Sequence, residues 1–259
     1  MSWFLTACLL HAAQVGQQGF KPMEWHSLLA KEQFRSGDNV LPYRLMSPAN
    51  PKPGQKYPLV IFLHGAGERG NDNNVQLVHG VKEFANAQAR EKFPCFLIAP
   101  QCPTGKRWVE VDWSAKQHDM PPQPSEPLNW LLALLDKMKK EKPIDTNRIY
   151  VTGLSMGGYG TWDLLSRHAD MFAAAVPVCG GGDEAKAQVM KAVPIWVFHG
   201  AKDTAVIPER SRNMVAAVKK AGGNVKYTEY PEVGHDSWNK AYADPELLPW
   251  LFAQKLKSR

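Results

Sequence analysis

The fold is decided by residues 149–159, whose sequence IYVTGLSMGGY runs from β-branched and apolar residues into a Gly-x-Ser-x-Gly motif. The first part predicts a buried strand, and residues 159–167 have the apolar spacing of a helix. Ser155 is therefore predicted in a sharp turn between a strand and a helix, which is the setting of a nucleophile elbow. Such a turn strains the backbone of the serine and holds its Oγ toward substrate.

Two further expectations follow from this elbow. Side chains at Gly153 and Gly157 would collide with neighbouring backbone. The N–H of Met156 lies at the start of the helix, where hydrogen bonding and the helix dipole favour a negatively charged oxygen. We therefore expect Met156 to be one donor of an oxyanion hole. The five-residue motif alone also fits a glycine-rich turn with a capping serine, so the surrounding segments must decide.

The segment LVIFLHGAG (residues 59–67) predicts another buried strand that runs into a His-Gly turn. In folds with a nucleophile elbow, this upstream loop supplies the second N–H of the oxyanion hole, and small residues let the substrate carbonyl approach. Ala66 is the expected donor. His64 is interpreted as a residue that shapes the turn by local hydrogen bonds rather than as a catalytic base.

Residues 65–70 (GAGERG) also fit the G-x-G-x-x-G pattern of a dinucleotide site. A dinucleotide-binding loop opens directly into a helix, whereas residues 71–74 (NDNN) favour turns. No acidic residue ends a second strand at the expected distance. The sequence therefore predicts no dinucleotide cofactor.

An acid and a base follow at the expected positions of a catalytic triad. Residues 194–203 (PIWVFHGAKD) predict a strand that ends in a turn with Asp203, and residues 225–230 alternate like a strand before His235. Ser155, Asp203 and His235 have the chain order of an α/β-hydrolase triad. His235 would take the proton of the serine, and Asp203 would fix the tautomer of His235.

Each assignment has an alternative. Asp203 could instead cap the helix predicted over residues 208–221, and Asp183, which follows three glycines, could be the acid. Asp203 is preferred because its strand comes directly before the strand that leads to His235. His235 itself could be an ordinary turn histidine.

With these motifs the sequence resembles α/β-hydrolase esterases of the dienelactone hydrolase and polyhydroxybutyrate-depolymerase-like group, often described as phospholipase/carboxylesterase or prolyl-oligopeptidase-type hydrolases. The resemblance extends from Leu41 to the C-terminus. It implies hydrolysis of carboxylic esters through an acyl-enzyme, with no metal or organic cofactor, and feruloyl or acetyl esters of plant polysaccharide among the substrates. The segments that carry it are HGAGERGNDN (64–73), APQCP (99–103), GLSMGGYGTW (153–162), PVCGGGD (177–183), HGAKD (199–203) and GHDSW (234–238).

Length and composition agree with one catalytic domain, predicted over residues 21–259. A chain of 259 residues with 44% hydrophobic content can bury one sizeable core. Strands alternate with helical stretches such as residues 128–140 and 208–220, which predicts an α/β fold with a mostly parallel sheet and helices on both faces.

Charge and cysteine spacing exclude other classes of function. The 31 basic and 25 acidic residues leave a net charge of +6 without a basic face interleaved with aromatics, so nucleic-acid binding is not expected. Cys8, Cys95, Cys102 and Cys179 lack C-x-x-C spacing, so no zinc site is expected.

Residues 1–20 are interpreted as either a short signal peptide or a flexible N-terminal tail, and the first interpretation predicts a secreted or periplasmic protein. Residues 5–8 (LTAC) also resemble a lipobox, although they lie close to the start. No other apolar run approaches the roughly 20 residues that span a bilayer.

Substrate preference is expected to reside in residues 101–127, an irregular stretch that is long for a connection. Trp108 lies in this stretch and Trp238 follows His235, so at least one of the two is expected to line the cleft. No helical lid is predicted between Cys179 and Pro194, which favours short acyl or aryl esters over large lipids. Competing hypotheses are a prolyl-oligopeptidase-type peptidase and a non-catalytic binding protein on the same fold. The oligomeric state stays open.

Overall fold

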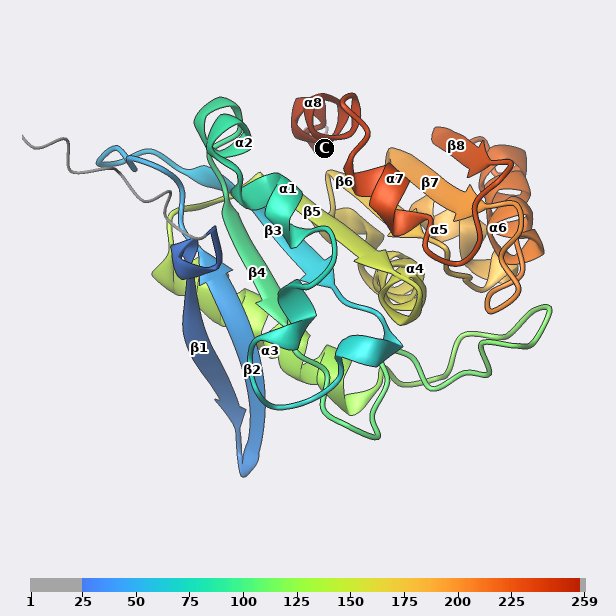
Figure 1. The fold of residues 1–259 in the computed structure, drawn as a ribbon, viewed down its shortest axis with the longest axis horizontal. Helices are drawn as coiled ribbons and strands as arrows, with labels where there is room; N and C mark the ends of the chain where they lie inside the picture. The colour runs from blue at the N-terminus through green and yellow to red at the C-terminus, as the bar shows by residue number, and fades with distance from the viewer. Residues whose placement is uncertain (1–24, 257–259) are drawn as a thin grey trace, which may run out of the picture.

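The computed structural model describes residues 25–256, and within them eight strands form one sheet. The strand order is β1-β2-β4-β3-β5-β6-β7-β8 (Figure 1). The pairs β1–β2 and β2–β4 are antiparallel, and all other neighbours are parallel. The strands are β1 (Leu29–Ser36), β2 (Asn39–Met46), β3 (Tyr57–Leu63), β4 (Phe96–Pro100), β5 (Ile144–Leu154), β6 (Ala174–Val178), β7 (Ile195–Gly200) and β8 (Val225–Tyr230).

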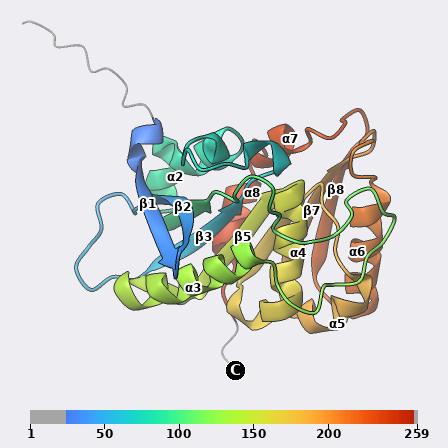
Figure 2. The same ribbon diagram turned by 90° about the horizontal axis from the view of Figure 1, so that it is seen from below.

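Helices cover both faces of this sheet, as Figure 2 shows edge-on. One apolar core lies under α3, α4, α5 and α6, and a second lies under α1, α7 and α8. The predicted α/β-hydrolase architecture is thereby confirmed. The α-helices are α1 (Val81–Ala85), α2 (Ala87–Lys92), α3 (Glu126–Glu141), α4 (Met156–His168), α5 (Ala187–Met190), α6 (Glu209–Lys220), α7 (Trp238–Tyr242) and α8 (Leu247–Ala253).

The central strands are buried because helices cover both of their faces. Every residue of β3 is buried, and so are the last six residues of β5. This explains why both strands are continuous apolar runs rather than alternating ones. Strand β5 begins at Ile144, five residues before the predicted start, and α4 begins at Met156, where the N–H at the start of the helix is expected, three residues before the apolar spacing begins. Helix α4 therefore starts directly after Ser155.

The stretch between β4 and α3, residues 101–125, contains no helix or strand, as predicted. In Figure 2 it passes in front of α4 and reaches the side of α6. Met120 of this connection donates to Asp183, which follows the carboxyl end of β6, so the connection reaches the edge where the parallel strands end. In open α/β sheets this edge is where ligands bind.

The segment between Cys179 and Pro194, where no helical lid is predicted, contains only short helical turns. The segment holds a single 3₁₀ turn, Glu184–Lys186, and the four-residue helix α5. Met190 of α5 is fully buried, so this segment belongs to the core.

The expected signal peptide or tail, residues 1–20, lies outside the described residues. Among residues 25–256, no helix combines the length and the apolar character that a bilayer crossing requires.

Candidate active site

The turn at Ser155 has the strained geometry that the motif predicts. Ser155 has φ 52° and ψ −117°, and residues other than glycine rarely adopt a positive φ. A Cβ on Gly157 would lie 2.0 Å from the carbonyl oxygen of Leu63, and one on Gly153 would lie 2.4 Å from that of Gly157. The expected collisions are confirmed, and they explain why both positions are glycine.

Ser155, His235 and Asp203 come together in one hydrogen-bonded chain. Ser155 Oγ lies 2.8 Å from His235 Nε2, and His235 Nδ1 lies 2.7 Å from Asp203 Oδ2. Because Nδ1 faces the carboxylate, it carries the proton, and Nε2 accepts from the serine hydroxyl. The three residues follow β5, β7 and β8, whose carboxyl ends meet at one edge of the sheet. This is the arrangement of a nucleophile, a base and an orienting acid.

Asp203 is buried and holds its charge through hydrogen bonds on both oxygens. Its Oδ1 accepts from the N–H groups of Ala205 and Val206 at 2.9 Å each, and its Oδ2 also lies 3.1 Å from His199 Nε2. Burial alone would raise the pKa of Asp203. The hydrogen bonds from His199, His235 and Val206 outweigh burial, so its pKa lies well below the ordinary value.

The backbone N–H groups of Met156 and Ala66 are the candidate oxyanion donors. Met156 is the first residue of α4, and Ala66 is the first of a 3₁₀ turn, Ala66–Glu68, directly after β3. First-turn N–H groups have no partner inside their own helix. In the described part of the chain, neither group donates a hydrogen bond to another segment. Both are free to bind an oxygen at this edge.

His64 is buried beneath the loop that carries Ala66. Its Nδ1 lies 2.6 Å from the carbonyl oxygen of Gly65, and its Nε2 accepts from the N–H of Cys102 at 2.9 Å. Burial lowers the pKa of His64 to about 4, and the positive charge of Arg69 acts in the same direction. His64 is therefore neutral near pH 7. It ties the Ala66 loop to the start of the irregular connection, in the local role expected for it.

Of Trp108 and Trp238, at least one of which is expected to line the cleft, Trp108 does not, and its place among the substrate-binding candidates is wrong. Its indole is fully buried in the core, and Nε1 donates to the carbonyl oxygen of His64 at 3.0 Å. The hydrogen bond and the apolar surroundings draw the ring inward, although its neighbours in sequence are polar. Trp238 is half-buried, and its ring lies edge-to-face with His235, with centroids 5.3 Å apart at 87°.

Asp183, the alternative acid, is used elsewhere. Its Oδ1 accepts from the N–H of Ala185 at 2.9 Å, and its Oδ2 accepts from the N–H of Met120 at 2.9 Å. Asp183 therefore caps a 3₁₀ turn and holds the irregular connection, while Asp203 contacts the base.

Sequence reasoning missed two residues behind the triad. His199 is fully buried, with Nδ1 lying 2.7 Å from Ser211 Oγ and Nε2 shared between Asp203 and the carbonyl oxygen of Val206. The spacing of four between His199 and Asp203 was the available signal. Cys179 was also missed, because only the fold brings β6 beside the elbow.

Cys179, Asp203 and His235 have ligand atoms within 4.8 Å of one another, which is the spacing of a metal site. Burial raises the pKa of the Cys179 thiol to about 12, so the thiolate that metals prefer is disfavoured. The histidine and carboxylate atoms are already bonded to each other. The donor set fits a triad better than a metal centre.

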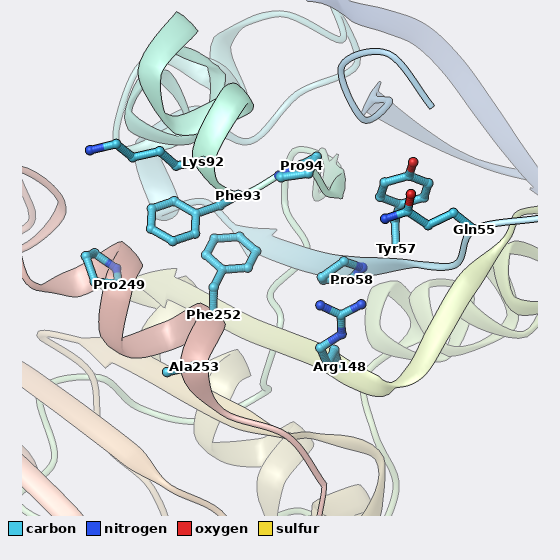
Figure 3. A pocket seen from close by; sticks show the side chains of 10 residues that line it. All are labelled: Gln55, Tyr57, Pro58, Lys92, Phe93, Pro94, Arg148, Pro249, Phe252 and Ala253. Atoms are coloured by element: carbon cyan, nitrogen blue, oxygen red, sulfur yellow. The ribbon is translucent and has the colours of Figure 1, made fainter. Parts of the chain in front are cut away.

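A pocket at the opposite edge of the sheet is drawn in Figure 3. It is lined by Tyr57 at the start of β3, by Arg148 and by the stacked rings of Phe93 and Phe252. None of the triad residues reaches it, since those follow the carboxyl ends of their strands. The catalytic interpretation therefore rests on the Ser155 edge.

Comparisons with known proteins agree with this geometry. The sequence profile of the dienelactone hydrolase family matches residues 114–245, a range that contains Ser155, Asp203 and His235. The chain belongs to the dienelactone hydrolase family. Among solved structures, a thermostable esterase is 40% identical with a TM-score of 0.82, over 89% of this chain and 64% of that one.

Other similar proteins are less alike in sequence. The bifunctional acetylxylan esterase/xylanase XynS20E of Neocallimastix patriciarum is 37% identical over 61% of this chain and 20% of its own length. A ferulic acid esterase structure is 18% identical with a TM-score of 0.65, over 87% of this chain and 98% of that one, and shows the fold alone. The chain spans between a fifth and about two fifths of the length of the curated relatives it matches.

Proposed function

We propose that this protein is a serine hydrolase that cleaves carboxylic esters through an acyl-enzyme. The observation that carries the proposal is the hydrogen-bonded chain from Ser155 Oγ through His235 to Asp203, at a strained elbow. The family membership and the esterases among its similar proteins support the same chemistry. The intact triad argues against a purely non-catalytic binding role.

The reaction proceeds in two steps. His235 Nε2 takes the hydroxyl proton while Ser155 Oγ forms a bond to the ester carbonyl carbon. The carbonyl oxygen becomes an oxyanion, which the N–H groups of Ala66 and Met156 stabilise. The tetrahedral intermediate expels the alcohol, which receives the proton from His235. Water then attacks the acyl-enzyme with His235 again as base, releasing the acid and restoring Ser155.

The finer proposal is that the substrates are short acyl or aryl esters, including feruloyl or acetyl esters of plant polysaccharide. An acetylxylan esterase among the relatives supports this class. Trp238, beside His235, is the aromatic surface proposed to contact the substrate. We also propose that the protein acts outside the cytoplasm, since one relative is described as a secreted protein of Arthroderma benhamiae.

The proposal is tested with 4-nitrophenyl esters and peptide anilides, using wild type and Ser155→Ala. Wild type is expected to hydrolyse the esters, and the variant to lose about 10³-fold or more in kcat with its thermal stability nearly unchanged. An organophosphate should label Ser155 and no other serine. Retention of more than about a tenth of the activity in the variant contradicts the assignment. Faster cleavage of anilides than of esters would favour a peptidase.

A further inference from the structure

Arg210 is a fully buried cation near the start of α6. Its Nη2 donates to the carbonyl oxygen of Gly182 at 3.2 Å and to His118 Nδ1. Its Nε and Nη1 are also buried and have no hydrogen-bond partner. A buried charge is costly unless it is paired and hydrogen-bonded, so two idle donors on such a group point to an absent acceptor.

The two side chains in contact with Arg210, His118 and Tyr159, are neutral. Burial and the charge of Arg210 lower the pKa of His118 to about 4, and burial raises the pKa of Tyr159 to about 12. The two neighbouring carboxylates are used elsewhere: Asp183 on backbone N–H groups, and Asp203 on the triad. The amino end of α6 adds further positive potential. The buried guanidinium therefore has no carboxylate bonded to it.

Arg210 lies against the first turns of α4, the helix that begins directly after Ser155. Its guanidinium carbon is 5.7 Å from the ring centroid of Tyr159, which is one helical turn beyond Ser155 and donates its N–H to the Ser155 carbonyl at 3.1 Å. The guanidinium lies against the glycine segment after β6, since a Cβ on Gly181 would be 2.4 Å from Nε. The next residue, Ser211, bonds to His199 behind the acid. Arg210 thus shares the edge of the sheet with the triad.

The cover over Arg210 is the irregular connection. His118 lies in it, between two sets of attachments to the rest of the chain. Before it, Tyr159 Oη donates to the carbonyl of Trp113 at 3.1 Å. After it, Met120 N donates to Asp183 at 2.9 Å, and Arg167 donates to the carbonyls of Pro121 and Pro122. Displacing His118 would open Nη2 together with the two idle donors. The planar guanidinium is suited to a carboxylate, which accepts two parallel hydrogen bonds.

We propose that Arg210 is an anion subsite of the active site and binds a carboxylate carried by the ester substrate. The inference rests on the proposed ester hydrolysis and names its substrate class as acidic esters. In the bound state the substrate carboxylate replaces His118 as the acceptor and pairs with the guanidinium. The carboxylate can belong to the acyl part or to the alcohol part of the ester.

The test compares acidic esters with neutral amides of the same shape. For the acyl side, the 4-nitrophenyl monoester of glutaric acid is paired with that of its monoamide. For the alcohol side, 4-acetoxybenzoate is paired with 4-acetoxybenzamide. In at least one pair, wild type should favour the acid in kcat/KM by about tenfold or more, as expected for charge-assisted hydrogen bonds. Arg210→Gln should abolish the preference, and Arg210→Lys should keep part of it.

Arg212→Gln is the matched control, because Arg212 lies two residues along the same helix but is exposed and paired with Glu229. Its acid-to-amide ratio should equal that of wild type. If Arg210→Gln fails to fold, His118→Asp supplies a tethered carboxylate at the same guanidinium, and it too should abolish the preference. An equal ratio in wild type and the folded variants overturns the subsite.

Binding is measured separately, so that the two proposals fail separately. Calorimetry of glutarate with Ser155→Ala needs no turnover, and binding should be lost in Ser155→Ala/Arg210→Gln. Hydrolysis of neutral esters without glutarate binding or an acid preference overturns the subsite alone. Arg210-dependent glutarate binding in a protein that hydrolyses no ester supports the anion site and contradicts the proposed hydrolase.

Discussion

At the scale of single residues, Asp203 shows how the site depends on hydrogen bonds around the reacting groups. Both of its oxygens are occupied, one by two backbone N–H groups and the other by two histidines. These bonds keep the carboxylate ionised although it is buried, because they lower its pKa. The charge is thus available to orient His235 and to stabilise its protonated form.

Asp203→Asn should lower kcat by about 10⁴-fold, because an amide no longer fixes the required tautomer of His235. Asp183→Asn should change kcat by less than about tenfold, since its carboxylate only receives backbone N–H groups. Ester hydrolysis measures both effects, with circular dichroism as the check on folding. A crippled Asp183→Asn beside an active, folded Asp203→Asn would reverse the assignment of the acid.

The lowered pKa of His64 predicts how the free energy of unfolding depends on pH. Its folded pKa of about 4 lies below the ordinary value of 6.5, so between these pH values only the unfolded chain binds the proton. The stabilisation is complete above pH 6.5 and is lost as the pH falls toward 4. The loss from this group is on the order of 3 kcal/mol.

Urea unfolding of wild type and His64→Gln at several pH values measures this loss. The variant should be less stable at pH 7 but should lose less of its free energy of unfolding between pH 6.5 and 4. Parallel pH profiles for the two proteins would contradict a neutral, buried His64.

At the scale of elements, the elbow depends on how closely α4 approaches β3. The helix starts at Met156 although the glycines that follow have low helix propensity. The close packing that these glycines permit outweighs that low propensity. Apolar spacing indicates the helix only from residue 159, whereas the Gly-x-Ser-x-Gly motif places its start at Met156. Contact with another element, rather than local preference, fixes where α4 begins.

Gly157→Ala should therefore cost more than about 4 kcal/mol or prevent folding, because the new Cβ would lie 2.0 Å from the carbonyl oxygen of Leu63. Gly67→Ala is the matched control, with no atom within 4 Å of the added Cβ. Its stability should stay within about 1 kcal/mol of wild type. Thermal unfolding measures both. Equal stability of the two variants would mean that the elbow can relax.

At the scale of the whole molecule, the fold and the candidate triad could be predicted because their signals are local. Apolar runs predict β3, β5 and β7. The Ala66 loop follows β3, Ser155 follows β5, and the turn with Asp203 follows β7. The burial of Trp108 could not be predicted, because it depends on the path of a long irregular connection across the core. Arg210 was missed for the same reason, since its partner His118 is distant in sequence. His199 was missed although Asp203 lies only four residues away, because the spacing alone does not show that the histidine is buried behind the acid.

The three cysteines of the described residues offer a measure of global stability. Cys95, Cys102 and Cys179 are free and buried, and burial raises the pKa of each thiol to about 12. In a Cys8→Ser background, a thiol reagent should not label the native protein, and labelling in denaturant should follow global unfolding. Rapid labelling of one thiol under native conditions would reveal local opening instead.

The glycines of α4 also bear on the order of folding. Gly157, Gly158 and Gly160 fall in its first turns, and each is about 1 kcal/mol poorer than alanine in a helix. Alone, a segment of this length and composition would stay unfolded in water. We expect its first turn to form only after β3, β5 and β6 have paired, because these strands and the residues that follow them provide the backbone against which Gly157 and Gly158 pack. We therefore expect the strained turn at Ser155 to form late in folding, after these strands have paired.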